Sequence, residues 1–373
     1  MTGMLSTQNL AVGYNRHILL QGIDISLDRG KILTLIGPNG AGKSTILKTI
    51  TRQIAPLGGK VFIGERSLGE ISGKELAKQT AVVLTDRVHP ELMSCAEVVA
   101  MGRYPYTDMF GKLSDHDKAV IKASLERVHA EDIADQDFST LSDGQRQRIM
   151  LARAICQEPE IIVLDEPTAF LDIRYKIELL DILRTMARDR GTTVIMSLHE
   201  VDLAMKISDE LLCLDGEKIA AYGTPEEILS SNAIEKLYNI RSGSYNYLFG
   251  SVELPKPDGD PKVFVLAGNG RGTPFFRALQ KKGIPFAAGI LFENDVDCQT
   301  ADVLSSHAVT NPAFEPVSET VLAEAKELLL RCGAVLDAET PNGKRNPANM
   351  ELLDFAQESG IPVYRKIPEG GFA

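Results

Sequence analysis

The sequence predicts an α/β protein in which buried parallel strands alternate with helices. Residues 31–36 form an apolar run typical of a buried strand, and residues 44–50 have a helical pattern, with a glycine-rich loop between them. Residues 161–164 form a second apolar run, which two carboxylates follow directly. From residue 262 onward, short apolar runs again alternate with helical patterns. These observations predict a large α/β domain followed by a small parallel α/β domain.

The composition is that of a globular protein with more than one domain. A chain of 373 residues is long enough for two or three domains. The net charge of −11 disfavours a nucleic-acid-binding surface, so no nucleic acid partner is expected. The five cysteines are scattered without a C-x-x-C pair, which indicates reduced thiols rather than a disulfide or zinc framework. We recognise no signal peptide and no transmembrane segment.

The loop at residues 37–45 matches the phosphate-binding pattern G-x-x-x-x-G-K-[ST] without a departure. Its glycines allow the backbone to approach a phosphate closely, and the N-terminus of the following helix attracts an anion. Lys43 is expected to reach the β- and γ-phosphates, and Ser44 is expected to bind Mg²⁺. The predicted nucleotide-binding residues of this loop are Gly37, Pro38, Asn39, Gly40, Ala41, Gly42, Lys43, Ser44 and Thr45.

An antiparallel pair of strands is expected before this loop. Residues 5–27 alternate between apolar and polar side chains, with a turn near residues 13–16. Tyr14 lies at that turn. Its ring either stacks on a nucleobase or packs in the core or on the surface, and the pattern alone does not decide between these interpretations.

Two carboxylates and a histidine follow buried strands. Asp165 and Glu166 come directly after the run at 161–164, as expected when a parallel strand delivers acids at its carboxyl end. Asp165 is expected to hold Mg²⁺, directly or through water, and Glu166 to polarise the water that attacks the γ-phosphate. Another apolar strand, at residues 192–198, ends at His199, where a contact to the γ-phosphate would be useful.

A helical region is predicted from about residue 87 to residue 157. Residues 95–102 and 117–128 have apolar side chains at helical spacing, and an aromatic, proline-broken loop is expected between them. Further on, Ser142 is a suitable N-cap for a helix that extends through Ala154. The N-terminus of that helix offers a second place for an anion.

These motifs, in this order, resemble the ATP-binding subunits of ABC transporters. They are the P-loop, the sequence LSDGQ at residues 141–145, the strand with Asp165 and Glu166, Leu171-Asp172, and His199. The resemblance covers about residues 5–250. It implies an ATP- and Mg²⁺-dependent hydrolase at residues 1–253, with a RecA-like core, an antiparallel β subdomain and a helical subdomain at about residues 87–157.

The resemblance further implies a homodimer of ATPase subunits. Each ATP would lie between the P-loop of one copy and Ser142, Gly144 and Gln145 of the other. Catalysis would then depend on Glu166 and on residues supplied by both copies.

Other site residues take their roles from the same resemblance. Tyr14 becomes the residue that stacks on adenine, Asp172 a contact across the dimer, and His199 the switch histidine. The chain departs from the family at two positions. Asp143, in the LSDGQ sequence, stands where the family's signature motif usually has glycine. Asp86 stands where the family's Q-loop usually has glutamine. Asp86 is still expected to bind Mg²⁺, through water.

The loop at residues 101–106 resembles that of ATPases in importers for iron-siderophores, haem and cobalamin, without choosing among the three. This resemblance implies integral membrane permease partners, a peripheral location on the cytoplasmic face of the cell membrane, and an extracellular substrate-binding protein as an indirect partner. The alternative is a soluble ABC-type ATPase that acts on nucleic acid or translation. That alternative would favour a basic face or a second ATPase cassette, and the sequence shows neither.

The C-terminal part is predicted to be a linker at residues 254–261 and an α/β domain at residues 262–373, with a regulatory or ligand-sensing role. A small polar ligand is expected beyond the carboxyl ends of its strands. The loop at residues 268–273 resembles a dinucleotide fingerprint, with Glu293 in the place of the ribose-binding acid. However, its spacing is G-x-G-x-G and Thr273 occupies the third fingerprint position. Tight turns explain the glycines equally well, and an enzyme that uses its own nucleotide remains a third hypothesis.

Overall fold

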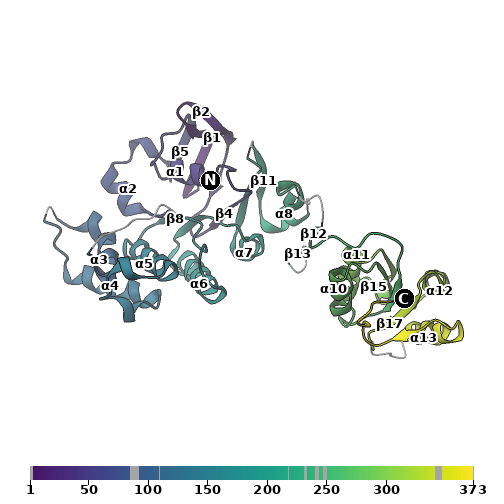
Figure 1. Cartoon of the computed structure of the whole chain (residues 1–373). Coiled ribbons are helices and arrows are strands. Elements are labelled where there is room, and N and C mark those ends of the chain that lie inside the picture. Colours follow the sequence, from purple (N-terminus) through teal and green to yellow (C-terminus); the bar gives the residue numbers. More distant parts are fainter. Residues whose placement is uncertain are drawn as a thin grey trace. The chain divides into compact units, whose positions relative to one another are not determined.

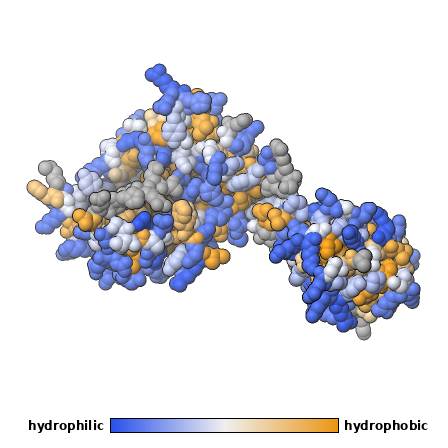
Figure 2. Space-filling view, viewed as in Figure 1, coloured by the Kyte–Doolittle hydropathy of each residue, from blue (hydrophilic) through white to orange (hydrophobic). Residues whose placement is uncertain are grey.

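The computed structural model describes residues 3–84, 92–108, 110–216, 218–230, 233–239, 243–246, 250–340 and 347–372. The chain divides into two compact units, Met1–Asn239 and Ile240–Ala373 (Figure 1). Hydrophilic side chains cover most of the visible surface of each unit (Figure 2). None of the helices in the described part of the chain combines the length and the apolar composition that a bilayer crossing requires.

A six-stranded sheet forms the centre of the first unit, in the order β11-β10-β4-β9-β8-β7. All neighbours in it are parallel except the hairpin of β10 and β11. Its strands are β4 (Ile32–Ile36), β7 (Thr80–Val83), β8 (Ile161–Asp165), β9 (Thr193–Ser197), β10 (Glu210–Leu214) and β11 (Ile219–Gly223). Because parallel strands end at the same edge, the segments that follow β4, β8 and β9 meet there.

The predicted antiparallel strands form a second sheet, with strand order β2-β1-β5-β6 and β3 paired to β1. Its members are β1 (Leu5–Tyr14), β2 (His17–Ile23), β3 (Ser26–Leu27), β5 (Gly58–Ile63) and β6 (Arg66–Ser67). Helix α1 (Lys43–Ile50) shares one hydrophobic core with this sheet and the central one, through residues such as Leu10, Ile46 and Val163. This shared core holds the P-loop helix between the two sheets.

The helical region is a subdomain of short helices. Its elements are α3 (Cys95–Ala100), η2 (Met101–Tyr106), α4 (Asp115–Arg127), η3 (Glu131–Ile133), η4 (Phe138–Thr140) and α5 (Asp143–Cys156). One expectation was wrong: residues 101–106 form a 3₁₀-helix rather than a loop. Proline interrupts long helices, but its fixed φ angle suits a short 3₁₀ turn. Helix α2 (Gly73–Gln79) was not predicted, although Ser72 and Glu75 form a capping box.

The remaining elements of the first unit connect and flank the central sheet. They are η1 (Leu68–Glu70), α6 (Ile173–Arg190), α7 (Val201–Ile207), α8 (Pro225–Ser230) and α9 (Ala233–Leu237). Helix α8 begins at Pro225, and the fixed φ angle of proline suits the first turn of a helix.

The second unit is a five-stranded parallel sheet with helices on both faces, which confirms the predicted fold class. The strand order is β16-β15-β14-β17-β18. Its elements are β14 (Val263–Leu266), α10 (Thr273–Lys281), β15 (Phe286–Phe292), α11 (Val296–Leu304), β16 (His307–Asn311), α12 (Glu319–Arg331), β17 (Ala334–Asp337), α13 (Ala348–Glu358) and β18 (Val363–Tyr364). Helices α10 and α11 pack on Val263 and Val265, whereas α12 and α13 pack on Phe264 and Leu266. This alternation along β14 places the two helix pairs on opposite faces.

A small hairpin precedes this sheet. It consists of β12 (Ser244–Asn246) and β13 (Ser251–Glu253). The segment at residues 254–261, predicted to be a linker, contains no helix or strand.

Candidate functional site

The glycine-rich loop joins the end of β4 to the start of α1. The backbone φ angles of Gly37 and Gly42 are 150° and 95°, in the region that favours glycine. A Cβ atom at Gly37 would lie 2.1 Å from the carbonyl oxygen of Leu214, and one at Gly42 would lie 2.7 Å from Cδ1 of Leu20. The loop therefore needs glycine at both positions for its backbone conformation and for its packing.

Lys43 brings a buried positive charge to this loop. Its Nζ atom donates hydrogen bonds to the carbonyl oxygens of Gly37 at 2.7 Å and Pro38 at 3.0 Å. Burial lowers the pKa of Lys43, and the negative charges of Glu166 and Asp165 oppose that shift. The electrostatic influence of both carboxylates on Lys43 places the predicted lysine and the predicted acids in one cluster.

Ser197 connects the two acidic residues. It lies opposite Asp165 in the pairing of β8 with β9. Its hydroxyl donates to Oδ1 of Asp165 at 2.6 Å, and the backbone N–H of Glu166 donates to its Oγ at 2.9 Å. Ser197 was not predicted as a site residue, because its position depends on which strands pair and in which register.

Glu166 and His199 face each other across the edge of the sheet. Oε1 of Glu166 lies 2.6 Å from Nε2 of His199, and both side chains are partly exposed. The φ angle of Glu166 is 51°, in the left-handed region. A non-glycine residue there costs about 1–3 kcal/mol, and such strain is often found at functional sites. The structure therefore brings together the carboxylate and the histidine that were predicted separately.

Tyr14 lies beside the P-loop helix. It is the last residue of β1, and the residue is 48% exposed. The hydroxyl of Thr45, in the first turn of α1, donates to its hydroxyl at 3.4 Å. The ring is thus an exposed aromatic surface next to the phosphate-binding loop, rather than part of the core.

The LSDGQ motif forms the start of α5. As predicted, Ser142 is the N-cap, and it forms a capping box with Gln145. The Gln145 N–H donates to Oγ of Ser142 at 3.4 Å, and Oε1 of Gln145 accepts from the Ser142 N–H at 2.9 Å. Asp143 lies in the first turn, where a negative charge favours a helix, and it pairs with Arg146 at 3.6 Å. Aspartate in place of the usual glycine is therefore compatible with this helix start.

Asp172 begins the next long helix, close to the LSDGQ motif. It is the N-cap of α6 and accepts a hydrogen bond from the Tyr175 N–H at 3.0 Å. A Cβ atom on Gly144 would lie 3.4 Å from Cδ2 of Leu171, so this loop and the start of α5 are neighbours. Among the described residues, no hydrogen bond or ion pair joins Ser142, Gly144, Gln145 or Asp172 to residues 37–45. Asp86 lies outside the described residues.

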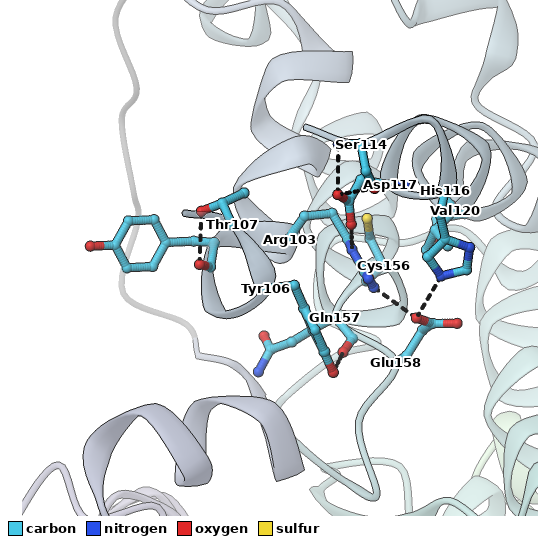
Figure 3. A network of polar contacts seen from close by, with 12 residues as sticks. Arg103, Tyr106, Thr107, Ser114, His116, Asp117, Val120, Cys156, Gln157 and Glu158 are labelled. Atoms are coloured by element: carbon cyan, nitrogen blue, oxygen red, sulfur yellow. Dashed lines mark hydrogen bonds and ion pairs between the residues drawn. The ribbon is translucent and has the colours of Figure 1, made fainter. Parts of the chain in front are cut away.

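Arg103 anchors the far end of α5 (Figure 3). Its Nε donates to Oδ1 of Asp117 at 2.7 Å, and its Nη1 donates to the Cys156 carbonyl and to Oε2 of Glu158, both at 2.8 Å. The guanidinium carbon lies 4.1 Å from the centre of the Tyr106 ring. This buried network joins η2, α4 and the C-terminal end of α5, so it fixes the helix that begins with LSDGQ.

Asp117 makes the stability of this network depend on pH. Hydrogen bonds from Ser114 and from Arg103 lower the pKa of Asp117 to about 2, although burial opposes the shift. An aspartate with a lowered pKa stabilises the fold above its unfolded-state value of 3.8, and this stability is lost as the pH falls toward 2. We expect Asp117→Asn to destabilise the protein in urea unfolding at neutral pH, and to do so less as the pH falls below 3.8. The exposed Asp115→Asn is the control, and an equal pH dependence of both variants would contradict this role.

The glycine loop of the second unit binds carboxylates of its own chain. Asp297 is fully buried, and its Oδ2 accepts from the N–H groups of Gly268 at 3.0 Å and Gly272 at 2.7 Å. Its Oδ1 accepts from the N–H and the hydroxyl of Thr273, both at 2.8 Å. Oδ2 of Asp295 accepts from the Asn269 N–H at 2.6 Å. These amides are the ones that a dinucleotide phosphate would use, so the structure disfavours the dinucleotide interpretation.

Models of known families match both units. The family model described as ABC transporter matches residues 20–169, which contain the P-loop, the LSDGQ motif and the carboxylate pair. A second model, the MJ0874 family, matches residues 286–369 of the second unit.

Three relatives show how far the similarity extends. The ABC transporter ATP-binding protein MJ0873 of Methanocaldococcus jannaschii is 42% identical, over 77% of this chain and 100% of its own length. The iron(3+)-hydroxamate import ATP-binding protein FhuC of Bacillus subtilis is 35% identical, over 63% of this chain and 88% of its own. The cobalamin import ATP-binding protein BtuD of Halobacterium salinarum is 31% identical, over 82% of this chain and 78% of its own.

Solved structures agree with this assignment. An inward-facing ABC transporter described as of metal-chelate type is 30% identical, with a TM-score of 0.56, and the match covers 63% of this chain and 88% of that one. The chain therefore belongs to the ATP-binding proteins of ABC transporters, which are ATP hydrolases.

Proposed function

We propose that this protein powers the import of a bulky metal chelate, namely an iron-siderophore, haem or cobalamin. The support comes from its relatives, which include import ATPases for iron(3+)-hydroxamate and for cobalamin. The similarity to the cobalamin protein covers 82% of the chain and so extends past residue 239 into the second unit, whereas the hydroxamate protein covers 63%. Cobalamin is therefore the first ligand to test.

In this proposal, ATP lies with its adenine against Tyr14 and its phosphates on residues 37–45. Lys43 binds the β- and γ-phosphates. The Ser44 hydroxyl and the Asp165 carboxylate offer oxygen ligands of the type that fits Mg²⁺, and Asp86 would add a ligand through water. Bound there, Mg²⁺ would neutralise charge on the phosphates.

Hydrolysis would depend on the cluster at the edge of the central sheet. Glu166 polarises the attacking water and accepts its proton. His199, in contact with Glu166, orients the carboxylate and reaches the γ-phosphate. Ser197 keeps Asp165 and the backbone of Glu166 in register through its two hydrogen bonds.

The active assembly would contain two copies of the chain. Ser142, Gly144 and Gln145 of one copy would close on the ATP held by the P-loop of the other, and Asp172 would make a contact across the dimer. These residues lie at the starts of α5 and α6, and in the described part of the chain no hydrogen bond or ion pair joins them to their own P-loop. A second copy would give them a role. The dimer would bind membrane permease subunits at the cytoplasmic face and act indirectly with an extracellular binding protein.

The test is transport by a reconstituted complex. A tagged chain is purified with its membrane partners, placed in proteoliposomes with ATP, and assayed for uptake of cobalamin and of a ferric siderophore. We expect a multi-spanning membrane protein to co-purify and cobalamin uptake to require ATP. Co-purification with ribosomes or RNA, without a membrane protein, would instead favour the alternative function in nucleic acid metabolism or translation.

Asp86 is expected to matter less than the P-loop lysine. We predict that Asp86→Asn lowers Mg²⁺-dependent ATP turnover by less than Lys43→Ala does, because water can partly replace a ligand that acts through water. Lys43 makes charge-assisted contacts that water cannot replace. Steady-state ATPase assays of both variants across a range of Mg²⁺ concentrations measure this difference. Equal loss of activity in the two variants would indicate a direct role for Asp86.

A further inference from the structure

A cavity of about 950 Å³ lies at the carboxyl ends of the parallel strands in the second unit. Asn269 reaches it from the loop after β14, Phe292 from the end of β15 and Phe314 from the loop after β16. The helix starts at Leu322 and Ala348 complete its wall. Parallel α/β sheets bind their ligands at this edge, and small-molecule pockets have volumes of roughly 300–1,000 Å³.

The backbone around this cavity is unsuited to an anion. The N–H groups of Gly268, Asn269, Gly272 and Thr273 already donate to the carboxylates of Asp295 and Asp297. A phosphate would have to displace the fully buried carboxylate of Asp297, or the partly buried one of Asp295, to reach them. The glycine loop therefore does not provide the anion site that such loops usually supply.

Apolar and acidic side chains line most of the cavity, together with the neutral amides of Asn269 and Asn294. Phe292, Phe314 and Leu322 provide apolar surface, while Glu315 and Glu351 add carboxylates that are exposed to solvent. None of the described lining residues is basic. Glu351 also pairs with Lys326 at 2.6 Å. The Glu315 carboxylate is therefore the stronger candidate to pair with a positive charge on a ligand. Apolar walls with carboxylates favour a ligand that has an apolar body and a positive charge.

We infer that this cavity binds an organic cation, an amine attached to an apolar or aromatic body. The amine would lie near Glu315 and Glu351, and the apolar body would lie against Phe292, Phe314 and Leu322. This ligand site is separate in sequence and chemistry from the ATP site of the first unit. It does not depend on the identity of the transported compound.

The chain contains no tryptophan, which permits a direct test. Tryptamine and indole-3-acetate share an indole ring but carry opposite charges, and the fluorescence anisotropy of indole reports binding of either one. The full-length protein is titrated with excess ADP and Mg²⁺ present, so that indole does not stack on Tyr14. We expect tryptamine to bind at least on the order of tenfold more tightly than indole-3-acetate. Lys344 and Arg345 lie outside the described residues. Indole-3-acetate, the anionic probe, tests whether their positive charges influence which ligand binds.

Charge variants locate the site. Glu315→Gln and Glu351→Gln are each expected to weaken tryptamine binding by about two- to fivefold, as for a partly exposed ion pair. Glu358→Gln, at the other end of α13, is the matched control and should leave binding unchanged. Preference for indole-3-acetate, equal affinity for both probes, or no binding of tryptamine would overturn the inference. Equal effects of Glu351→Gln and Glu358→Gln, with no effect of Glu315→Gln, would also overturn it.

Discussion

Replacing Glu166 with glutamine is expected to lower ATP turnover by at least about 100-fold while ATP still binds. A positioned general base typically contributes 10²- to 10⁴-fold, and an amide cannot accept the proton. Glutamine keeps the size of the side chain, and the hydrogen bond from the residue 166 N–H to Ser197 does not involve the side chain. The loss should therefore fall on hydrolysis rather than on binding, because Lys43 and the P-loop remain intact.

Two measurements separate these effects. Steady-state ATPase assays give the turnover, and calorimetric titration gives the affinity for ATP. If two copies close on ATP as proposed, size-exclusion chromatography in ATP and Mg²⁺ should show the variant accumulating as a dimer. Glu131→Gln, a change at an exposed carboxylate of the helical subdomain, should leave turnover and affinity near wild type. Turnover of Glu166→Gln within a few-fold of wild type would exclude Glu166 as the base.

Asp297→Asn is expected to destabilise the second unit by about 3–5 kcal/mol. The buried carboxylate accepts four hydrogen bonds, from Gly268, Gly272 and two donors of Thr273. An asparagine side chain would turn its NH₂ group toward two of these donors, so that donor faces donor. Hydrogen bonds to a charged group contribute about 1.5–3 kcal/mol each, and buried donors left unpaired add a desolvation cost.

Hydrogen exchange measured by mass spectrometry can locate this effect. Peptides from residues 262–340 of Asp297→Asn should lose protection, while peptides from the first unit should keep it. Asp302→Asn is the matched control, because Asp302 is an exposed aspartate on the same helix α11. Its free energy of unfolding should change by no more than about 0.5 kcal/mol. Equal protection in the two variants would mean that Asp297 does not hold the glycine loop.

Features that depend on neighbouring residues were predictable from the sequence. The P-loop, the strand that ends in Asp165 and Glu166, and the N-cap at Ser142 are short patterns whose backbone conformation is local. The alternation of strands and helices after residue 262 was equally local, and the observed elements follow it in order. The start of helix α2 is equally local, because Ser72 and Glu75 carry the capping-box pattern.

The sequence by itself thus determined the fold class of both units and the P-loop, carboxylate and histidine residues of the proposed nucleotide site. Tertiary structure alone decided which distant groups meet. Ser197 joins Asp165 only because β8 pairs with β9 in one register, and Arg103 reaches Cys156 only because η2 packs on α5. Likewise, the sequence of the glycine loop resembles a phosphate site. In the folded chain, however, the carboxylate of Asp297, from another helix, accepts the hydrogen bonds that its N–H groups donate. Local patterns encode backbone conformation and hydrophobic periodicity, whereas the partner of a buried polar group is selected by packing between segments far apart in the chain.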